Sequence, residues 1–275
     1  MKPAAFDYIR AGTEEEAVQV LARFGGNARI LAGGQSMMAM LNMRLLEPEI
    51  VVDISAIDSL KSIRIDGDVV EVRAAVTQAE LLAWPKLKEE IPLVAKALPW
   101  VGHFQTRNRG TVCGSIAHSE PSSELPLCLA TLDAQVVLRS AAGIRRLKAS
   151  EFQTGMLSTS KSAEEMVVAV RFPRHRPHEG SGFQEIARRH GDFAIVALAA
   201  RTIGDRTLLG VGGVADRPTV RDFGRAQGPE LAEALNAFAW EMGGNNDIHA
   251  TARYRRELVR RLGQKVIEEA RACQF

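Results

Sequence analysis

The sequence is poor in cysteine. It holds three among 275 residues, Cys113, Cys128 and Cys273, and no two of them form a CxxC pair. No cluster of cysteine and histidine has the spacing of a zinc or iron–sulfur site. We therefore expect no metal site, and the chain alone cannot carry a thiolate-bound redox cluster.

A large net charge and long apolar runs are also missing. The 35 Lys and Arg against 33 Asp and Glu leave a formal net charge of +2, which gives no electrostatic footprint for nucleic acid. The longest apolar run, residues 193–200, is far too short to cross a bilayer. Residues 1–7 show no basic flank before an apolar core, so we expect no secretory signal. These absences predict a cytoplasmic protein without a nucleic-acid partner or a membrane span.

The length predicts one large domain or two moderate ones. An apolar fraction of 46% and a charged fraction of 25% are ordinary values for a globular protein with a real core. Residues 173–182 are polar and contain two prolines and two glycines, which is typical of a linker. We place the domain boundary there, with one domain at 1–176 and a second at 177–275.

The first fifty residues read as a small β–α–β unit. Thr13 and Glu16 have the spacing of a capping box at the start of a helix. Residues 28–32 and 50–54 read as strands, and 36–43 as the helix between them. A helical connection favours parallel pairing of the two strands.

Strands outnumber helices in the next hundred residues. We expect strands at 69–76, 134–140, 144–148 and 165–172, helices at 77–84, 91–98 and 124–132, and a polar loop at 106–120. Strands so close in sequence indicate a mainly antiparallel sheet. The whole pattern predicts an α+β fold.

Beyond residue 182 we expect two or three strands, a helix at 230–241 and a last helix from about His249. The last helix has an apolar stripe at Tyr254, Leu258, Leu262, Val266 and Ala270. Its arginines at 253, 255, 256, 260 and 261 lie mostly off that stripe. They indicate a solvated face or, less often, a docking surface.

The first segment suited to ligand chemistry is Leu-Ala-Gly-Gly-Gln-Ser at 31–36, between a strand and a helix. Gly33 and Gly34 allow unusual backbone torsions and close approach of a ligand to peptide N–H groups. Such a turn before a helix suits an anion such as a diphosphate. Alone, the pattern is more often a structural turn.

The second segment is the long polar stretch 106–126, which contains Gly110 and Gly114. A loop of this length inside a compact domain is usually functional or disordered. Its apolar residues at 112, 116 and 117 argue against disorder. It also offers hydroxyl groups, the imidazole of His118 and the carboxylate of Glu124. On this evidence a ligand site and a structural loop are equally good interpretations.

Together the two segments resemble a known family. Ala-Gly-Gly-Gln-Ser at 32–36, followed by Thr-Val-Cys-Gly-Ser-Ile-Ala at 111–117 and Ser-Glu-Leu-Pro at 123–126, resembles the FAD-binding medium subunit of the xanthine dehydrogenase and carbon monoxide dehydrogenase (molybdenum hydroxylase) family. Further similar blocks follow in the same order at 164–173, 188–194, 209–214 and 247–256. The resemblance therefore spans nearly the whole chain.

The resemblance implies a PCMH-type FAD-binding domain of two subdomains, one small and βαβ-like, the other an antiparallel α+β unit, with FAD between them. A C-terminal α+β domain with a small antiparallel sheet and helices would follow. The cofactor-binding residues implied are Ala32, Gly33, Gly34, Gln35, Ser36, Thr111, Val112, Cys113, Gly114, Ser115, His118, Glu124, Val167 and Gln184. Amides and hydroxyls of 32–36 and 111–115 would hold the diphosphate and ribityl groups, and no residue is expected to be catalytic.

Three positions leave alternatives open. Cys113 stands where the family commonly has glycine, and it is either a reactive thiol or, more often in such places, a small packed residue. Some relatives carry a lysine just after the linker, whereas this chain has Gln184 and Glu185 there. His118 is either an acid/base group or a hydrogen-bonding partner of the cofactor or a neighbour.

The function implied is that of an electron-transfer subunit. A small partner chain would carry [2Fe–2S] clusters and a large one the molybdopterin centre, in a heterotrimer that pairs into a dimer. Electrons would pass through FAD to NAD+, O2 or another acceptor. Two alternatives remain, a stand-alone FAD-dependent oxidoreductase and a scaffold subunit that has lost FAD. A dinucleotide-binding reading of the glycines at 210–213 is poor, because no helix is expected after them.

Overall fold

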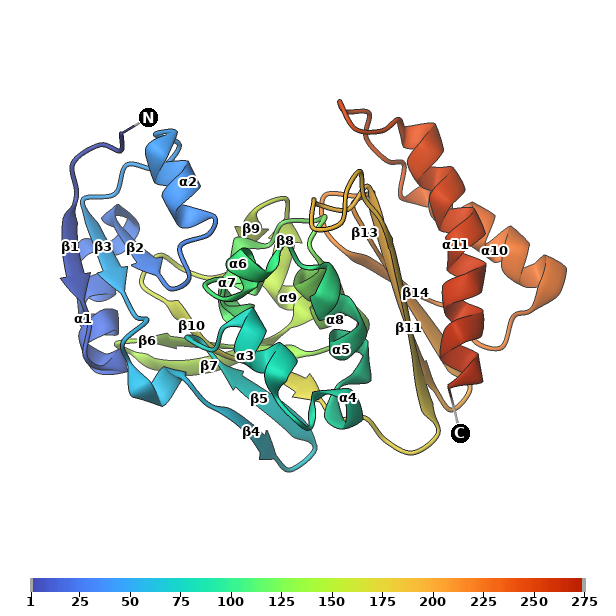
Figure 1. The fold of residues 1–275 in the computed structure, drawn as a ribbon, viewed down its shortest axis with the longest axis horizontal. Helices are drawn as coiled ribbons and strands as arrows, with labels where there is room; N and C mark the ends of the chain where they lie inside the picture. The colour runs from blue at the N-terminus through green and yellow to red at the C-terminus, as the bar shows by residue number, and fades with distance from the viewer. Residues whose placement is uncertain (1, 274–275) are drawn as a thin grey trace.

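A computed structural model of the chain describes residues 2–273. Three parts follow one another along the longest axis of the molecule: a small three-stranded unit, a central five-stranded sheet with its helices, and a four-stranded sheet backed by two helices (Figure 1). We call these the N-terminal unit, the central body and the C-terminal body. The α+β fold expected from the sequence is confirmed.

The N-terminal unit is a parallel sheet with the strand order β1-β3-β2. Its elements are β1 (Asp7–Arg10), α1 (Glu14–Phe24), η1 (Gly25–Asn27), β2 (Ala28–Leu31), α2 (Met37–Asn42) and β3 (Ile50–Asp53). The parallel pair β2 and β3 was expected; β1 was missed because it is four residues long and mostly exposed. Thr13 Oγ1 accepts from Glu16 N–H at 3.1 Å, as expected for a capping box. The Glu16 carboxylate, however, accepts from the N–H of Gly12 and not from that of Thr13.

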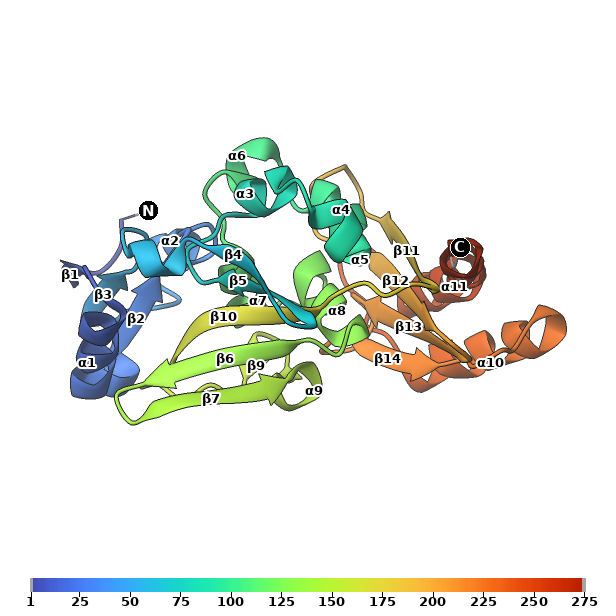
Figure 2. The ribbon, with the colours of Figure 1, turned by 90° about the horizontal axis from the view of Figure 1, so that it is seen from below.

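The central body is built on an antiparallel sheet with the order β4-β5-β10-β6-β7 (Figure 2). Its strands are β4 (Ile63–Asp66), β5 (Val69–Arg73), β6 (Gln135–Ser140), β7 (Gly143–Lys148) and β10 (Met166–Pro173), with the small pair β8 (Gln153–Gly155) and β9 (Ser158–Thr159). Its helices are η2 (Asp58–Leu60), α3 (Gln78–Ala83), α4 (Leu87–Glu90), α5 (Pro92–Ala97), η3 (Leu98–Trp100), α6 (Phe104–Arg107), α7 (Val112–His118), α8 (Glu124–Thr131) and α9 (Ala149–Phe152). α7 and α8 lie between the N-terminal unit and the C-terminal body (Figure 1).

The expectation of a continuous polar loop at 106–120 is wrong, because most of it is helical. Thr111 Oγ1 accepts from Gly114 N–H at 3.0 Å and caps α7. Val112 and Ile116, four residues apart, are both fully buried on one face of that helix. This short helix contains a glycine and several polar residues, so its sequence lacks the apolar periodicity by which a helix is predicted.

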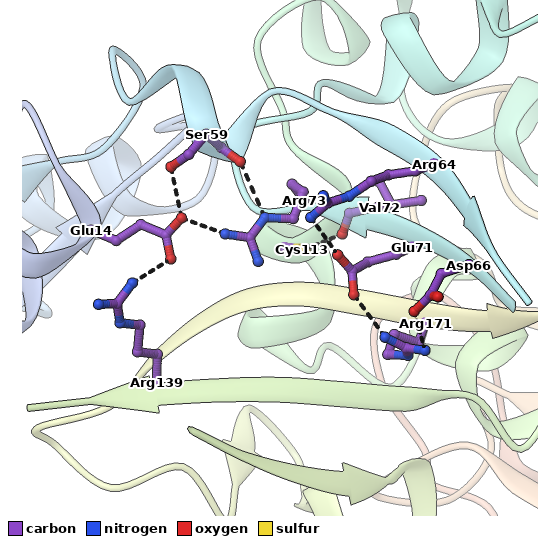
Figure 3. Close-up of polar contacts among 10 residues, drawn as sticks. All are labelled: Glu14, Ser59, Arg64, Asp66, Glu71, Val72, Arg73, Cys113, Arg139 and Arg171. Atoms are coloured by element: carbon purple, nitrogen blue, oxygen red, sulfur yellow. Dashed lines mark hydrogen bonds and ion pairs between the residues drawn. The ribbon is translucent and has the colours of Figure 1, made fainter. Parts of the chain in front are cut away.

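A cluster of ion pairs joins the N-terminal unit to the central sheet (Figure 3). Glu14 on α1 accepts from Ser59 Oγ at 2.7 Å, from Arg139 Nη1 on β6 at 2.9 Å, and from Arg73 on β5. Burial tends to raise the pKa of Glu14, but these hydrogen bonds outweigh it and lower that pKa. The carboxylate therefore stays charged and connects the two bodies.

The C-terminal body is an antiparallel sheet with two helices on one face. Its elements are β11 (Glu179–Ile186), β12 (Val196–Ile203), β13 (Arg206–Gly212), β14 (Thr219–Asp222), α10 (Gly228–Glu241) and α11 (Ala252–Ala272). It has four strands where two or three were expected, and the expected linker ends early because β11 begins at Glu179. A Cβ at Gly180 would lie 1.8 Å from Ala270 O, and one at Gly182 would lie 2.3 Å from Val266 O. These glycines allow close approach of α11 and do not mark a linker.

The apolar stripe expected on the last helix is partly wrong. The buried side of α11 consists of Arg255, Val259, Gly263, Val266, Ile267 and Ala270, whereas Tyr254 is 46% exposed. Arg255, assigned to the solvated face from the sequence, is 4% exposed. It donates to Gly213 O at 2.7 Å, to Ile195 O, and to Asp247 at 2.6 Å. A buried arginine of this kind ties the turn before β12 to the turn after β13.

We expect the substitution Arg255→Met to destabilise the chain by about 3 kcal/mol, because it leaves two buried carbonyls without a donor. Urea unfolding followed by circular dichroism would measure this change. The control is Arg253→Met on the exposed side of the same helix, for which we expect a change within about 0.5 kcal/mol. Equal effects of the two substitutions would contradict the structural role of Arg255.

Candidate functional site

The two glycine-bearing segments meet backbone to backbone. A Cβ on Gly33 would lie 2.2 Å from Arg109 O and 2.7 Å from Gly110 Cα, so only glycine fits there. The second segment is fixed in turn, since Gln78 N donates to Gly110 O at 2.8 Å and Val112 N donates to Val76 O at 3.1 Å. Residues almost eighty positions apart in sequence are therefore held together.

The turn after β2 exposes backbone donors. Gly34 has φ +70°, a left-handed conformation that favours glycine. Within residues 2–273, the N–H groups of Gly33, Gly34 and Gln35 donate no hydrogen bond to another part of the chain. Adjacent N–H groups of this kind form a concavity that suits an anion.

A groove of about 770 Å³ opens at this contact. That volume lies in the range of small-molecule and cofactor sites, about 300–1,000 Å³. The sequence-predicted residues that line it are Ala32, Gly33, Gly34, Gln35, Ser36, Thr111, Cys113, Gly114, Ser115, His118, Glu124 and Val167. The structure thus brings twelve of the fourteen together around one groove.

Two expected residues do not line the groove. Val112 is fully buried in the core on the inner face of α7. Gln184 lies on β11, two residues after Gly182, and alternation along a strand gives both the same face, the one that packs against α11. The assignment of Gln184 to the cofactor, which came from the resemblance, stays a prediction.

The sequence reading missed other lining residues. They include Arg29, Gln78, Gly102, Thr106, Lys161, Glu165 and Phe193. Lys161 Nζ donates to Ser162 O at 2.9 Å and to Glu165 O at 3.1 Å, and burial together with the Arg29 charge lowers its pKa. A single lysine in a polar turn carries no sequence signal that would have found it.

The C-terminal body supplies one end of the groove. Gly191, Asp192 and Phe193, in the turn between β11 and β12, all line it. This turn lies on the central body, because a Cβ at Gly191 would be 2.9 Å from Gly102 O. The ring of the neighbouring His190 stacks on Trp100 with 5.2 Å between centroids. Asp192 is thereby placed at the groove.

Burial sets the protonation of three groups at the groove. It raises the pKa of Glu124, which is 4% exposed, to about 7, although the residue's own N–H lowers it somewhat. It lowers the pKa of His118, against a smaller opposing effect of Glu120, so the imidazole is neutral at pH 7. Burial also raises the pKa of Cys113 to about 12, and its Sγ lies 3.5 Å from Val72 O (Figure 3). Of the two alternatives for Cys113, the structure therefore favours a small packed residue.

Neither a metal site nor a membrane span stands out in the part of the chain that the structure describes. Residues 2–273 contain no group of three or more His, Cys, Asp and Glu placed to hold a metal ion. Among these same residues, no helix has the length and apolar character needed to pass through a bilayer.

Comparison with known proteins agrees with this geometry. The family described as the FAD-binding domain in molybdopterin dehydrogenase matches residues 4–175. The chain is 32% identical to the 6-hydroxypseudooxynicotine dehydrogenase complex subunit alpha of Paenarthrobacter nicotinovorans, over 98% of this chain and 96% of that one. It is 31% identical to the glyceraldehyde dehydrogenase medium chain of Sulfolobus acidocaldarius, over 98% and 99%. A solved carbon monoxide dehydrogenase from Hydrogenophaga pseudoflava superposes with a TM-score of 0.91 at 28% identity, covering 99% of this chain and 100% of that one.

The fold and the groove define the class of protein, an FAD-binding subunit of an oxidoreductase. The chain belongs to the family of FAD-binding domains of molybdopterin dehydrogenases, as a medium subunit of the molybdenum hydroxylase type. The resemblance inferred from the sequence is confirmed.

The groove fits the cofactor of this family. Gly33 allows a backbone contact that any side chain would block, and unpaired N–H groups follow it. Gln78 also lines the groove, and its Oε1 is buried without a hydrogen-bond partner among the described residues. Apolar side chains such as Ile30, Met40 and Val101 complete the lining and suit flat ring systems.

We expect Gly33→Ala to weaken FAD binding by about tenfold or more, equivalent to about 1.4 kcal/mol, because the methyl group would force the two segments apart. FAD titration of the apoprotein, followed by flavin fluorescence, would measure the change. Gly26→Ala is the control, since Gly26 also lines the groove but a Cβ there meets nothing within 4 Å. An unchanged affinity in Gly33→Ala would show that the backbone contact does not shape the site.

Thiol labelling tests the assignment of Cys113. We expect one fast-reacting thiol in the native protein, Cys273, which is exposed. Cys113 and Cys128 are buried, and burial raises the pKa of both thiols, so they should react only after unfolding. Mass spectrometry after brief alkylation would identify the labelled residue. Rapid labelling of Cys113 in the folded protein would restore the reactive-thiol alternative.

Proposed function

We propose that this chain carries FAD and is the electron-transfer subunit of a heterotrimeric molybdenum hydroxylase. It accepts electrons from the [2Fe–2S] clusters of an iron–sulfur small subunit and delivers them to NAD+, O2 or another acceptor. A molybdopterin-binding large subunit oxidises the organic substrate. The complex is cytoplasmic, and two heterotrimers pair. Residues 1–176 form the FAD-binding domain and residues 177–275 the C-terminal domain.

The observation that carries this proposal is the backbone contact between Gly33 and Gly110 at the groove. It places the N–H groups of residues 33–35 beside the capped start of α7, where Thr111, Gly114 and Ser115 line the same groove. Backbone donors from two segments suit the two phosphates of FAD better than a single phosphate.

The residues of this chain bind and orient, and bound FAD would supply the one- and two-electron chemistry. The hydroxyls of Ser36, Thr111 and Ser115 are available to the ribityl and diphosphate oxygens. His118, neutral at pH 7, can donate or accept one hydrogen bond without adding charge. Val101 and Phe193 add apolar surface to the lining.

The partner subunits are inferred from what this chain cannot supply and from its relatives. Cys113 and Cys128 are buried and Cys273 is exposed near the end of α11, so they cannot share one cluster. The relatives' names give them as parts of a larger complex, "subunit alpha" and "medium chain". Their substrates, 6-hydroxypseudooxynicotine, glyceraldehyde and carbon monoxide, differ widely while the fold is retained. This suits an assembly in which another chain selects the substrate.

Reconstitution of the purified chain tests the proposal. We expect the apoprotein to bind one FAD and to show a flavin absorbance spectrum, but not to oxidise organic substrates by itself. Titration with dithionite should then reduce the bound flavin. A chain that binds no FAD would contradict the proposal and favour a scaffold, and turnover of an organic substrate without partners would favour a stand-alone oxidoreductase.

A further inference from the structure

An unpaired carboxyl group is buried on the strand that faces the central body. Glu185 on β11 is 5% exposed, and neither of its carboxylate oxygens has a hydrogen-bond partner within residues 2–273. Phe183, two residues earlier, belongs to the core of the central body and not to the core beneath α11. Because side chains alternate along a strand, Glu185 points the same way as Phe183 and opposite to Gln184.

A second buried carboxyl group belongs to the central body. Glu124 begins α8, is 4% exposed and lines the groove. Across the C-terminal sheet, Glu185 is opposite Ala197, which in turn is opposite Gly212. A Cβ at Gly212 would lie 3.0 Å from Pro121 O. The segment that leads into Glu124 therefore rests on the same row of the sheet that contains Glu185.

Among residues 2–273, no cation forms an ion pair with either carboxyl group. Arg201 on β12 is engaged by Glu179 at 2.9 Å, and Lys96 on α5 is engaged by Glu269 on α11. Arg188 and Arg189, which follow β11, are exposed. Arg255 on α11, a cation buried against the same sheet, is engaged by Asp247 and by backbone carbonyls. Glu120, in the segment that leads into Glu124, is a further carboxyl group and acts on His118. The thiol of Cys128 on α8, His118 on α7 and the buried, unpartnered hydroxyl of Ser119 are neutral.

Two buried carboxylates without a cation cannot both ionise at low cost. Burial, followed by the Glu124 charge, raises the pKa of Glu185 to about 8. Burial raises the pKa of Glu124 to about 7. Groups coupled in this way lose their protons as a pair and not independently.

We propose that Glu124 and Glu185 retain one proton between them at neutral pH, so that the pair carries one negative charge instead of two. Its consequence for the cofactor rests on the function proposed above. The retained proton removes one of two negative charges from this part of the groove, and when Glu124 holds it, Glu124 can donate a hydrogen bond to FAD. Glu185 acts through Glu124 and is a positioning residue.

The proton can be observed without FAD. In the apoprotein labelled with ¹³C at glutamate carboxyl carbons, we expect two coupled titrations above the ordinary carboxyl range of about 4.3. In Glu185→Gln, Glu124 should titrate alone and at a lower pH, because the repulsion is gone. Glu230→Gln, which removes one exposed charge on α10, is the control and should change nothing. If Glu185→Gln does not fold, Glu124→Gln should lower the midpoint of Glu185 in the same way.

Ordinary carboxyl midpoints in the wild-type protein would overturn the proposal, and so would a Glu124 midpoint unaffected by Glu185→Gln. The effect on the cofactor is a separate measurement. We expect the Kd of the wild-type chain for FAD to rise about tenfold between about pH 6 and about pH 9, and to be flat in Glu124→Gln, which keeps a neutral donor. If the shared proton is confirmed but the Kd for FAD does not change with pH, the contact between Glu124 and FAD is refuted. Absence of FAD binding at every pH would instead refute the proposed function and leave the shared proton standing.

Discussion

The groove depends on one steric constraint, the absence of a side chain at Gly33. Two segments almost eighty residues apart touch there through their backbones, and a single methyl group would lie 2.2 Å from a carbonyl oxygen. Ion pairs at a distance from the groove support this contact. Glu14 bonds to Arg73 and Arg139 and holds the N-terminal unit against the central sheet (Figure 3). The ligand site therefore depends on the relative position of two bodies, and any change that separates them should also open the groove.

A site built mainly from backbone groups explains how the family keeps its fold while its complexes act on different molecules. Peptide N–H groups bind anions in the same way whatever side chains surround them, provided that the glycines remain. About two thirds of the residues differ between this chain and its relatives at 31% and 32% identity, yet the described relatives cover almost its full length. The C-terminal body also takes part, since Phe193 and Gly191 reach the groove from the turn between β11 and β12. Arg255 holds that turn through Ile195 O. We infer that this domain shapes the cofactor site as well as any contact with partners.

Local patterns and a family resemblance predicted much of this structure. The helix expected at 77–84, the parallel pair β2 and β3, and the helix α8 follow from spacing over a few residues and are confirmed. Prediction from the sequence failed where the interacting residues belong to different parts of the fold. It could not show that Gly180 and Gly182 admit α11, that Arg255 lies on the buried face of that helix, or that Lys161 reaches the groove. The side-chain direction of Gln184 could not be predicted either, because side chains alternate along a strand with a period of two and the start of β11 was not known.

The unpaired carboxyl groups lower the stability of the fold, which makes their presence informative. Both have a folded-state pKa, about 7 for Glu124 and about 8 for Glu185, above the value of about 4.3 expected in the unfolded chain. Below that lower value both states are protonated and nothing is lost. As the pH rises towards the folded-state values, the unfolded chain ionises first, so these groups progressively reduce the free energy of unfolding. Glutamine at 185 would avoid this penalty with nearly the same shape. A glutamate that costs stability at neutral pH, placed next to the residue that lines the groove, is easier to understand as part of the cofactor site than as part of the core.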